Sequence, residues 1–176
     1  MKFIETGLHG ALVLEHSPVR DERGAFTRLW GLSEFQSRGI PFAVDQCSTA
    51  YNAANATLRG MHYQAAPCEE AKVVICTTGS FYDVIVDLRP DSATFLKWFA
   101  LEMSVEAYRA LYVPAGFAHG YLTTREHTTV QYLICGTYSP DHARGIRWDD
   151  PAIGIKWPAA PAVISSRDRD YPNFRR

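Results

Sequence analysis

The chain lacks several features that would each assign it to a class of protein. Its cysteines, four among 176 residues, are widely spaced and form no Cys-x-x-Cys pair, which excludes a zinc knuckle and a dense disulfide framework. No stretch approaches the roughly 20 apolar residues that a membrane helix needs, and the first residues carry no apolar signal segment. We therefore expect a cytoplasmic protein with no membrane partner, whose thiols are reduced and mostly buried.

The chain also lacks an excess of charge of either sign. Eighteen Lys and Arg stand against nineteen Asp and Glu, for a net charge of −1, and the basic residues are dispersed. Nucleic acid is bound mainly by concentrated positive charge, so we expect no nucleic acid partner. The Gly-x-Gly-x-x-Gly, Gly-Lys-Ser/Thr and Gly-x-Ser-x-Gly motifs are absent, which disfavours dinucleotide binding, phosphate transfer and serine hydrolysis. What remains is acid–base chemistry without a cofactor.

The patterning of the chain predicts an all-β protein. With 47% hydrophobic residues, a chain of this length can bury roughly 70% of its unfolded surface as one domain, which we place at residues 1–176. Residues 73–76 and 81–88 flank a Thr-Gly-Ser turn and are predicted to form a hairpin. Further short strands are predicted at 95–101, 110–113, 121–124 and 129–135.

Few helices interrupt these strands. A Ser-x-x-Gln capping box at residues 33–36, followed by Gly39 and Pro41, predicts one short helix, and a single turn is predicted after Ser104. The proline-rich end, residues 157–161, is expected to wrap back over the barrel. Many short antiparallel strands with few helices favour a cupin-like jelly roll, that is, a double-stranded β-barrel.

Three chemically distinct side chains on strand-like segments suggest an active site. His62 lies in the segment 58–64, Lys72 begins an apolar run, and Tyr132 lies inside another. An imidazole, an ammonium and a phenol can together remove a proton beside a ketone, stabilise the enolate and return the proton. Each also has a structural interpretation: a core histidine, a lysine reaching from a strand end to water, and a core tyrosine. No His-x-His pair is present, because Tyr63 follows His62, so we expect no metal.

Several longer segments resemble those of one enzyme family. They are DERGAF (21–26), LRGMHYQ (58–64), Lys72, DVIVDLRPDSATF (83–95), VPAGFAHGY (113–121), IKWP (155–158) and SSRD (165–168). Together they resemble the dTDP-4-dehydrorhamnose 3,5-epimerase family, in order, from about residue 4 to residue 174. The resemblance implies an isomerase of deoxysugar biosynthesis that inverts C3, C5 or both in a nucleotide-linked 4-keto-6-deoxy sugar, without cofactor or metal.

The resemblance also implies roles for individual residues. His62, paired with Asp168, matches the base, Tyr132 matches the acid on the other face of the sugar, and Lys72 matches the lysine near the C4 oxygen. The implied substrate-binding residues are Arg23, Phe26, Arg28, Gln46, Arg59, His119, Tyr138 and Arg167. Among these, Arg23 and Arg167 match basic positions near the pyrophosphate and sugar, and Tyr138 matches the residue that stacks on the base.

Departures from the family pattern concern the nucleotide. Arg28 stands where members of the rhamnose pathway usually carry Glu, Ala143 stands where many carry an acid, and residues 46–52 replace a Gln-Asp-Asn segment. A guanidinium can only donate hydrogen bonds, so our hypothesis is that Arg28 favours a base that presents an acceptor, such as cytosine. The alternative is that Arg28 is a surface residue paired with a neighbouring acid.

Three further expectations remain open. The same base and enolate would serve a monoepimerase acting at C3 or C5 only, or a 3,4-ketoisomerase, on a sugar nucleotide other than a dTDP sugar. A non-catalytic sugar-nucleotide binding module is the alternative of another class. The resemblance further implies a homodimer in which N-terminal strands pair, and the apolar segment 11–14 is our candidate for that strand.

Overall fold

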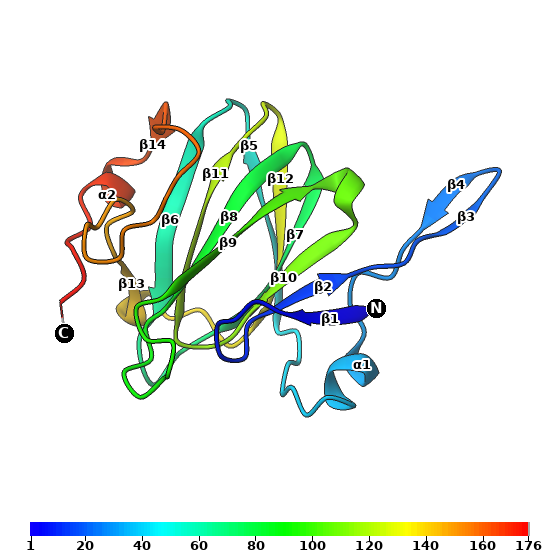
Figure 1. Ribbon diagram of the computed structural model, residues 1–176, viewed down its shortest axis with the longest axis horizontal. Coiled ribbons are helices and arrows are strands. Elements are labelled where there is room, and N and C mark those ends of the chain that lie inside the picture. Colours follow the sequence, from blue (N-terminus) through cyan, green and yellow to red (C-terminus); the bar gives the residue numbers. More distant parts are fainter. Residues whose placement is uncertain (176) are drawn as a thin grey trace.

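Two β-sheets packed against each other form the body of the protein, which a computed structural model describes for residues 1–175 (Figure 1). The first sheet has the order β1 (Lys2–Glu5), β2 (Leu12–Glu15), β10 (Arg109–Val113), β7 (Ala71–Thr78), β12 (Thr128–Cys135) and β5 (Gln46–Asn52). The second has the order β13 (Ala143–Gly145), β6 (Thr57–Gln64), β11 (Phe117–Thr123), β8 (Ser80–Asp87) and β9 (Trp98–Ser104). Neighbouring strands are antiparallel, except that β14 (Val163–Ile164) adds to β6 in parallel. The predicted all-β, cupin-like jelly roll is confirmed.

The hairpin predicted from residues 73–76 and 81–88 is wrong. Both segments are strands, but β7 pairs with β10 and β12 in the first sheet, whereas β8 pairs with β11 and β9 in the second. Gly79 lies between them with a φ of +75°, and a Cβ there would come within 2.4 Å of Thr128 Oγ1. The chain therefore turns from one layer into the other at this glycine. A two-residue alternation of apolar and polar side chains predicts that a segment is a strand, but it does not predict which strands pair with it.

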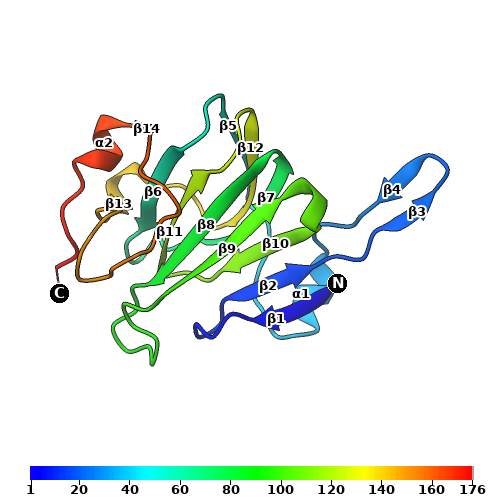
Figure 2. The same cartoon turned by 45° about the horizontal axis from the view of Figure 1, so that its top comes forward.

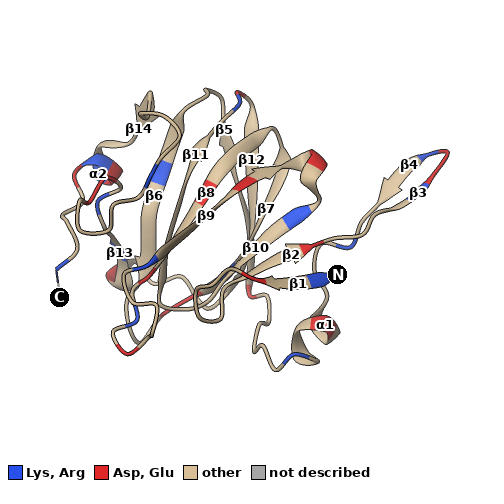
Figure 3. Cartoon of the chain, in the orientation of Figure 1, with Lys and Arg blue, Asp and Glu red and all other residues tan. Residues whose placement is uncertain are grey.

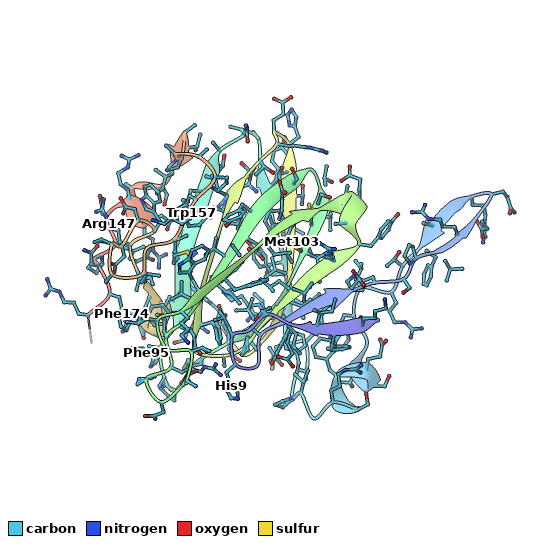
Figure 4. All side chains as sticks on the ribbon, in the orientation of Figure 1. His9, Phe95, Met103, Arg147, Trp157 and Phe174 are labelled. Carbon is cyan, nitrogen blue, oxygen red and sulfur yellow. The ribbon has the colours of Figure 1, made fainter. Side chains whose placement is uncertain are left out.

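Alternation along the strands separates the core between the sheets from the outer faces. In β7, Val74 and Cys76 pack in the central core, whereas Val73 and Ile75 pack on the outside of the first sheet. Met103 of β9 is fully buried in the central core and lies near the middle of Figure 4. Side chains one position apart thus face different layers, as strand geometry requires.

Each outer face has its own cover. α1 (Leu32–Gln36) and the segment after it lay Phe35 and Phe42 on the first sheet. Trp157 and Phe174 of the C-terminal segment pack on the second sheet (Figure 4). The chain end thus wraps back over the barrel, as predicted. The remaining short elements are η1 (Val105–Ala107), η2 (Pro140–His142) and α2 (Ser166–Arg169).

Of three local predictions, one is confirmed and two need correction. The predicted helix exists, but its N-cap is Gly31 and no side chain caps it, so the proposed capping box does not form. The turn predicted after Ser104 is confirmed as η1. Only Cys76 among the four thiols is buried, while Cys68 and Cys135 are partly exposed and Cys47 is exposed, so "mostly buried" is wrong.

A two-stranded arm, β3 (Val19–Asp21) and β4 (Gly24–Phe26), projects from the body. In both Figure 1 and Figure 2 it extends from the end of β2, on the side of the molecule away from α2. Val19 is 70% exposed and Phe26 is 72% exposed. The arm therefore presents apolar side chains to solvent, which is unusual unless another surface covers them.

The N-terminal edge of the first sheet is also exposed, but not at the predicted segment. Residues 11–14 fall largely within β2, which lies between β1 and β10, so β1 is the edge strand.

Blue and red residues are interspersed along the chain in Figure 3. Among the described residues, no helix has the length and apolar character needed to cross a membrane.

The buried carboxylate of Asp87, at the end of β8, gives a test of the fold. Burial raises its pKa, but hydrogen bonds from Arg89, Ser92 and Thr94 outweigh burial and lower it from 3.8 to about 2. A carboxyl with a lowered pKa stabilises the fold above its unfolded pKa, and this contribution is lost as the pH falls through the folded pKa.

We expect the wild type to lose about 2 kcal/mol of unfolding free energy relative to Asp87→Asn between pH 6 and pH 2. Urea unfolding of both proteins across this range measures the difference. If the unfolding free energies of the two proteins changed by the same amount across this range, the hydrogen bonds assigned to Asp87 would be contradicted.

Candidate active site

A β-bulge in β6 places Arg59 and His62 on the same face of the second sheet. His62 is opposite His119 and Arg59 is opposite Tyr121, so three steps on β6 match two steps on β11. Without this irregularity, residues three apart would face opposite sides of the sheet. Gly60 makes the bulge possible: its φ is +125°, and a Cβ there would lie 2.5 Å from the Gly120 Cα.

His62 and Asp168 form the predicted pair. The Nε2 atom of His62 lies 2.7 Å from Asp168 Oδ1, and the Gly60 N–H donates to Asp168 Oδ2 at 3.2 Å. Burial raises the pKa of Asp168, but these hydrogen bonds, the charge of His62 and Ser165 lower it below 3.8 overall. The carboxylate is thus ionised at neutral pH and holds the proton of the imidazole on Nε2, which leaves the Nδ1 lone pair free to accept a proton.

Lys72 is a buried, inward-facing lysine rather than a strand-end residue reaching to water. It is 9% exposed and lies on the same face of β7 as Val74 and Cys76. Its Nζ is 2.7 Å from Glu70 Oε1, and the Glu70 side chain is also nearly buried. Glu70, which was not predicted, supplies the anion that a buried ammonium requires.

Tyr132 faces the central core from β12, next to a chain of polar contacts. Burial raises its pKa well above 10, and the neighbouring Tyr121 hydroxyl raises it further. The phenol is therefore protonated at neutral pH. Tyr121 donates to Asn52 Oδ1 at 3.2 Å, and Arg59 Nε donates to the same oxygen at 2.9 Å. Asn52 of β5 thus orients Arg59 toward the site.

A second His–Asp pair lies deeper, and sequence reasoning found only half of it. His119 Nε2 is 2.6 Å from Asp83 Oδ1, and both side chains are buried. The other carboxylate oxygen of Asp83 has no hydrogen-bond partner among the described residues. The sequence pattern could have revealed Asp83. It lies between Phe81 and Ile85 on the face of β8 that points into the central core, where a carboxylate is rare unless it is paired.

These side chains surround two adjoining pockets. The inner pocket, of about 240 Å³, is lined by Ala50, Arg59, His62, Lys72, His119, Tyr121, Tyr132 and Ile134. The outer pocket, of about 200 Å³, is lined by His62, Tyr63, Gln64, Glu70, Lys72, Tyr138, Ala143, Arg144 and Arg167. His62 and Lys72 line both pockets. A larger hollow of about 750 Å³ beside β1 contains none of the predicted site residues.

The structure does not bring four of the predicted substrate-binding residues into these pockets. Arg23 is exposed at the tip of the arm and pairs with Asp21, and Phe26 lies on the same arm. Arg28 is exposed just beyond the arm and makes no ion pair within residues 1–175, so its predicted pairing with a neighbouring acid is not present. Gln46 of β5 donates to the Gly136 carbonyl instead of facing a pocket.

The fold and the site define an all-β, cupin-like protein with acid–base groups from both sheets around one cavity. The model of the dTDP-4-dehydrorhamnose 3,5-epimerase family matches residues 5–176. An enzyme of that name from Sinorhizobium fredii is 40% identical over 155 residues, 88% of this chain and 80% of the relative.

Solved structures agree with this match. The dTDP-4-dehydrorhamnose 3,5-epimerase of Bacillus anthracis, with TDP and PPi bound, has a TM-score of 0.95 and 38% identity, covering 98% of this chain and 99% of that chain. A 3′-monoepimerase from Streptomyces bikiniensis, in complex with dTDP-quinovose, has a TM-score of 0.87 and 32% identity, covering 95% and 85%. The chain belongs to the dTDP-4-dehydrorhamnose 3,5-epimerase family. It is an isomerase, an epimerase of deoxysugar biosynthesis.

Proposed function

We propose that the protein inverts C3 and C5 of a dTDP-linked 4-keto-6-deoxy sugar, with His62 as base, Tyr132 as acid and Lys72 beside the C4 oxygen. One observation carries this proposal: His62 of the second sheet and Tyr132 of the first sheet line the same inner pocket. A sugar ring between them has the base on one face and the acid on the other. Inversion requires this arrangement, because the proton must return to the face opposite its removal.

The steps follow from the side chains. C3 and C5 both flank the C4 ketone, so their protons are acidified by the same carbonyl. Nδ1 of His62 takes a proton, Asp168 stabilises the imidazolium, and the Lys72 ammonium stabilises the enolate oxygen. Tyr132, whose phenol is protonated at neutral pH, then gives a proton to the opposite face. Exchange with solvent returns both residues to their starting states.

The outer pocket suits the nucleotide. Arg144 and Arg167 bring positive charge to it, and Tyr138 is an exposed aromatic ring on which a base can stack. The relative from Bacillus anthracis has TDP bound, and this supports a dTDP sugar as the substrate. Arg59 and His119, which line the inner pocket, are proposed to contact the sugar.

We expect the wild type to incorporate two solvent deuterons, one at C3 and one at C5, when it is incubated with dTDP-4-keto-6-deoxyglucose in heavy water. NMR of the product counts and places them. A single deuteron would indicate the monoepimerase reaction of the Streptomyces bikiniensis relative, and a 3-keto product would indicate the ketoisomerase. No incorporation would indicate a binding module.

We further propose that the protein acts as a homodimer in which the arm of one protomer completes the site of its partner. Two observations support this. Arg23, Phe26 and Arg28 lie on or next to an arm that reaches neither pocket of its own chain. The arm exposes Val19 and Phe26, and within residues 1–175 no strand pairs with the outer edge of β1. A second protomer would cover both features.

Mixed dimers test this arrangement. His62→Ala with an intact arm and Phe26→Ala with an intact site are expected to be weak alone at low substrate concentration. Coexpressed, half of the dimers are mixed, and each has one complete site, so about a quarter of the wild-type activity returns. If each arm served its own chain, or if the protein were a monomer, coexpression would restore nothing.

A second candidate differs in the nucleotide, and Arg28 is the observation that favours it. Its guanidinium is exposed and has no ion-pair partner within residues 1–175, so it is free to donate hydrogen bonds to a base. Affinities of dTDP, CDP and GDP for the wild type and for Arg28→Glu decide the question. Tighter binding of CDP that reverses in Arg28→Glu supports this candidate, and a clear preference of the wild type for dTDP excludes it.

A further inference from the structure

Tyr171, just after α2, occupies space that a neighbour of His62 would normally fill. Gly145 of β13 is directly opposite His62 of β6. A Cβ on Gly145 would lie 2.3 Å from both Cε2 and Cζ of Tyr171. The tyrosine ring therefore lies against the bare backbone of Gly145, in the position of the missing cross-strand side chain. Side chains directly opposite each other on paired antiparallel strands are close enough to be in contact.

The same ring contacts the proposed base. The centroids of His62 and Tyr171 are 6.0 Å apart with an interplanar angle of 70°, an edge-to-face arrangement. Such pairs prefer this geometry and add stabilisation beyond their buried area. Asp168, only three residues earlier, holds Nε2 of the same imidazole. One short segment of chain therefore contacts the His62 ring with both a carboxylate and an aromatic ring.

The hydroxyl of Tyr171 has a separate partner. Arg167 Nε donates to Tyr171 Oη at 2.7 Å, and Arg167 lines the outer pocket. Next to the tyrosine, the Pro172 carbonyl accepts from the Arg147 N–H at 3.0 Å, which fixes the segment to the chain that leaves β13. Tyr171 is thus anchored from its backbone side, and its hydroxyl limits where an exposed arginine can point.

We propose that Tyr171 is a positioning residue with two separable roles. Its ring, lying on Gly145, holds the His62 imidazole in the orientation that faces Asp168 and the inner pocket. Its hydroxyl holds Arg167 toward the outer pocket, where the diphosphate of the substrate binds. This inference rests on the proposed function of His62 and of the outer pocket.

Two substitutions of Tyr171 separate the roles. Tyr171→Phe keeps the ring and removes the acceptor for Arg167, so we expect KM to rise about fivefold while kcat falls by less than about twofold. Tyr171→Ala also removes the ring, so we expect kcat to fall about 10- to 100-fold, because a small misplacement of a base has a large effect on rate. If kcat falls in Tyr171→Ala and stays near the wild-type value in Tyr171→Phe, the ring and not the hydroxyl positions the base.

Gly145→Ala tests the contact from the other side. The added Cβ must displace the Tyr171 ring, so we expect a fall in kcat similar to that of Tyr171→Ala. In the double variant the Cβ has room, so the loss should be no greater than that of Tyr171→Ala alone. If the fall in kcat of the double variant equalled the product of the two single-variant falls, the proposed contact would be contradicted.

Phe174→Ala is the matched control for general loosening of the C-terminal segment. Phe174 packs on the second sheet and is edge-to-face with Phe95 at 6.0 Å, and Figure 4 shows both at the same end of the molecule. We expect this variant to lower the melting temperature and leave kcat unchanged. If it lowers kcat as much as Tyr171→Ala does, Tyr171 has no specific positioning role.

A readout that does not need turnover separates this inference from the proposed function. The ¹⁵N spectrum of the His62 imidazole reports its tautomer and environment in the free protein. We expect Tyr171→Ala to change these signals and Tyr171→Phe to keep them. Unchanged signals in Tyr171→Ala would overturn the inference. A wild type without turnover, with these shifts present, would overturn only the proposed function.

Discussion

The carboxylate of Asp168 joins the parts of the chain that make the site. One oxygen contacts His62 Nε2 and the other accepts from the Gly60 N–H, so the acid binds both the imidazole and the bulge that presents it. A buried carboxylate is stable only when its oxygens are paired. The C-terminal segment that carries Asp168 also packs on the outside of the second sheet through Trp157 and Phe174. The catalytic pair therefore forms only when that segment is docked on the second sheet.

Two glycines provide the backbone space for this arrangement. Gly60 and Gly120 approach so closely that a Cβ on either would meet the other strand below 3 Å. The bulge that results turns Arg59 and His62 toward the same cavity. Lys72 and Tyr132 reach that cavity from the opposite sheet by plain alternation along β7 and β12. One cavity thus receives its base from an irregular strand and its cation and phenol from regular strands.

The sequence predicted the parts of the structure that depend on local pattern. The approximate positions of several strands follow from a two-residue period, and the grouping of His62 with Lys72 and Tyr132 follows from the types of residue present. The pattern did not decide whether Lys72 points inward or reaches from the strand end to water. Asp83 could have been found from the two-residue period. Pairing between strands is not local, so the chain's change of layer at Gly79 was missed.

The arm was missed for a related reason. Its residues resembled substrate contacts, yet nothing in the pattern of residues 19–28 says which way a two-stranded ribbon projects. The resemblance implied that Arg23, Phe26 and Arg28 bind substrate, and none of the three lines either pocket of its own chain. Whether a residue serves its own site or a partner's depends on assembly, which one chain does not encode in its strand pattern.

The central claim is that proton removal and proton return are carried out by different groups on opposite sides of one pocket. Isotope exchange with Tyr132→Phe and His62→Asn in heavy water tests it most directly, with NMR following deuterium content and configuration separately. The account predicts that Tyr132→Phe exchanges substrate protons while inverting few centres, and that His62→Asn does neither. Wild-type rates of inversion in Tyr132→Phe, or wild-type rates of exchange in His62→Asn, would contradict it.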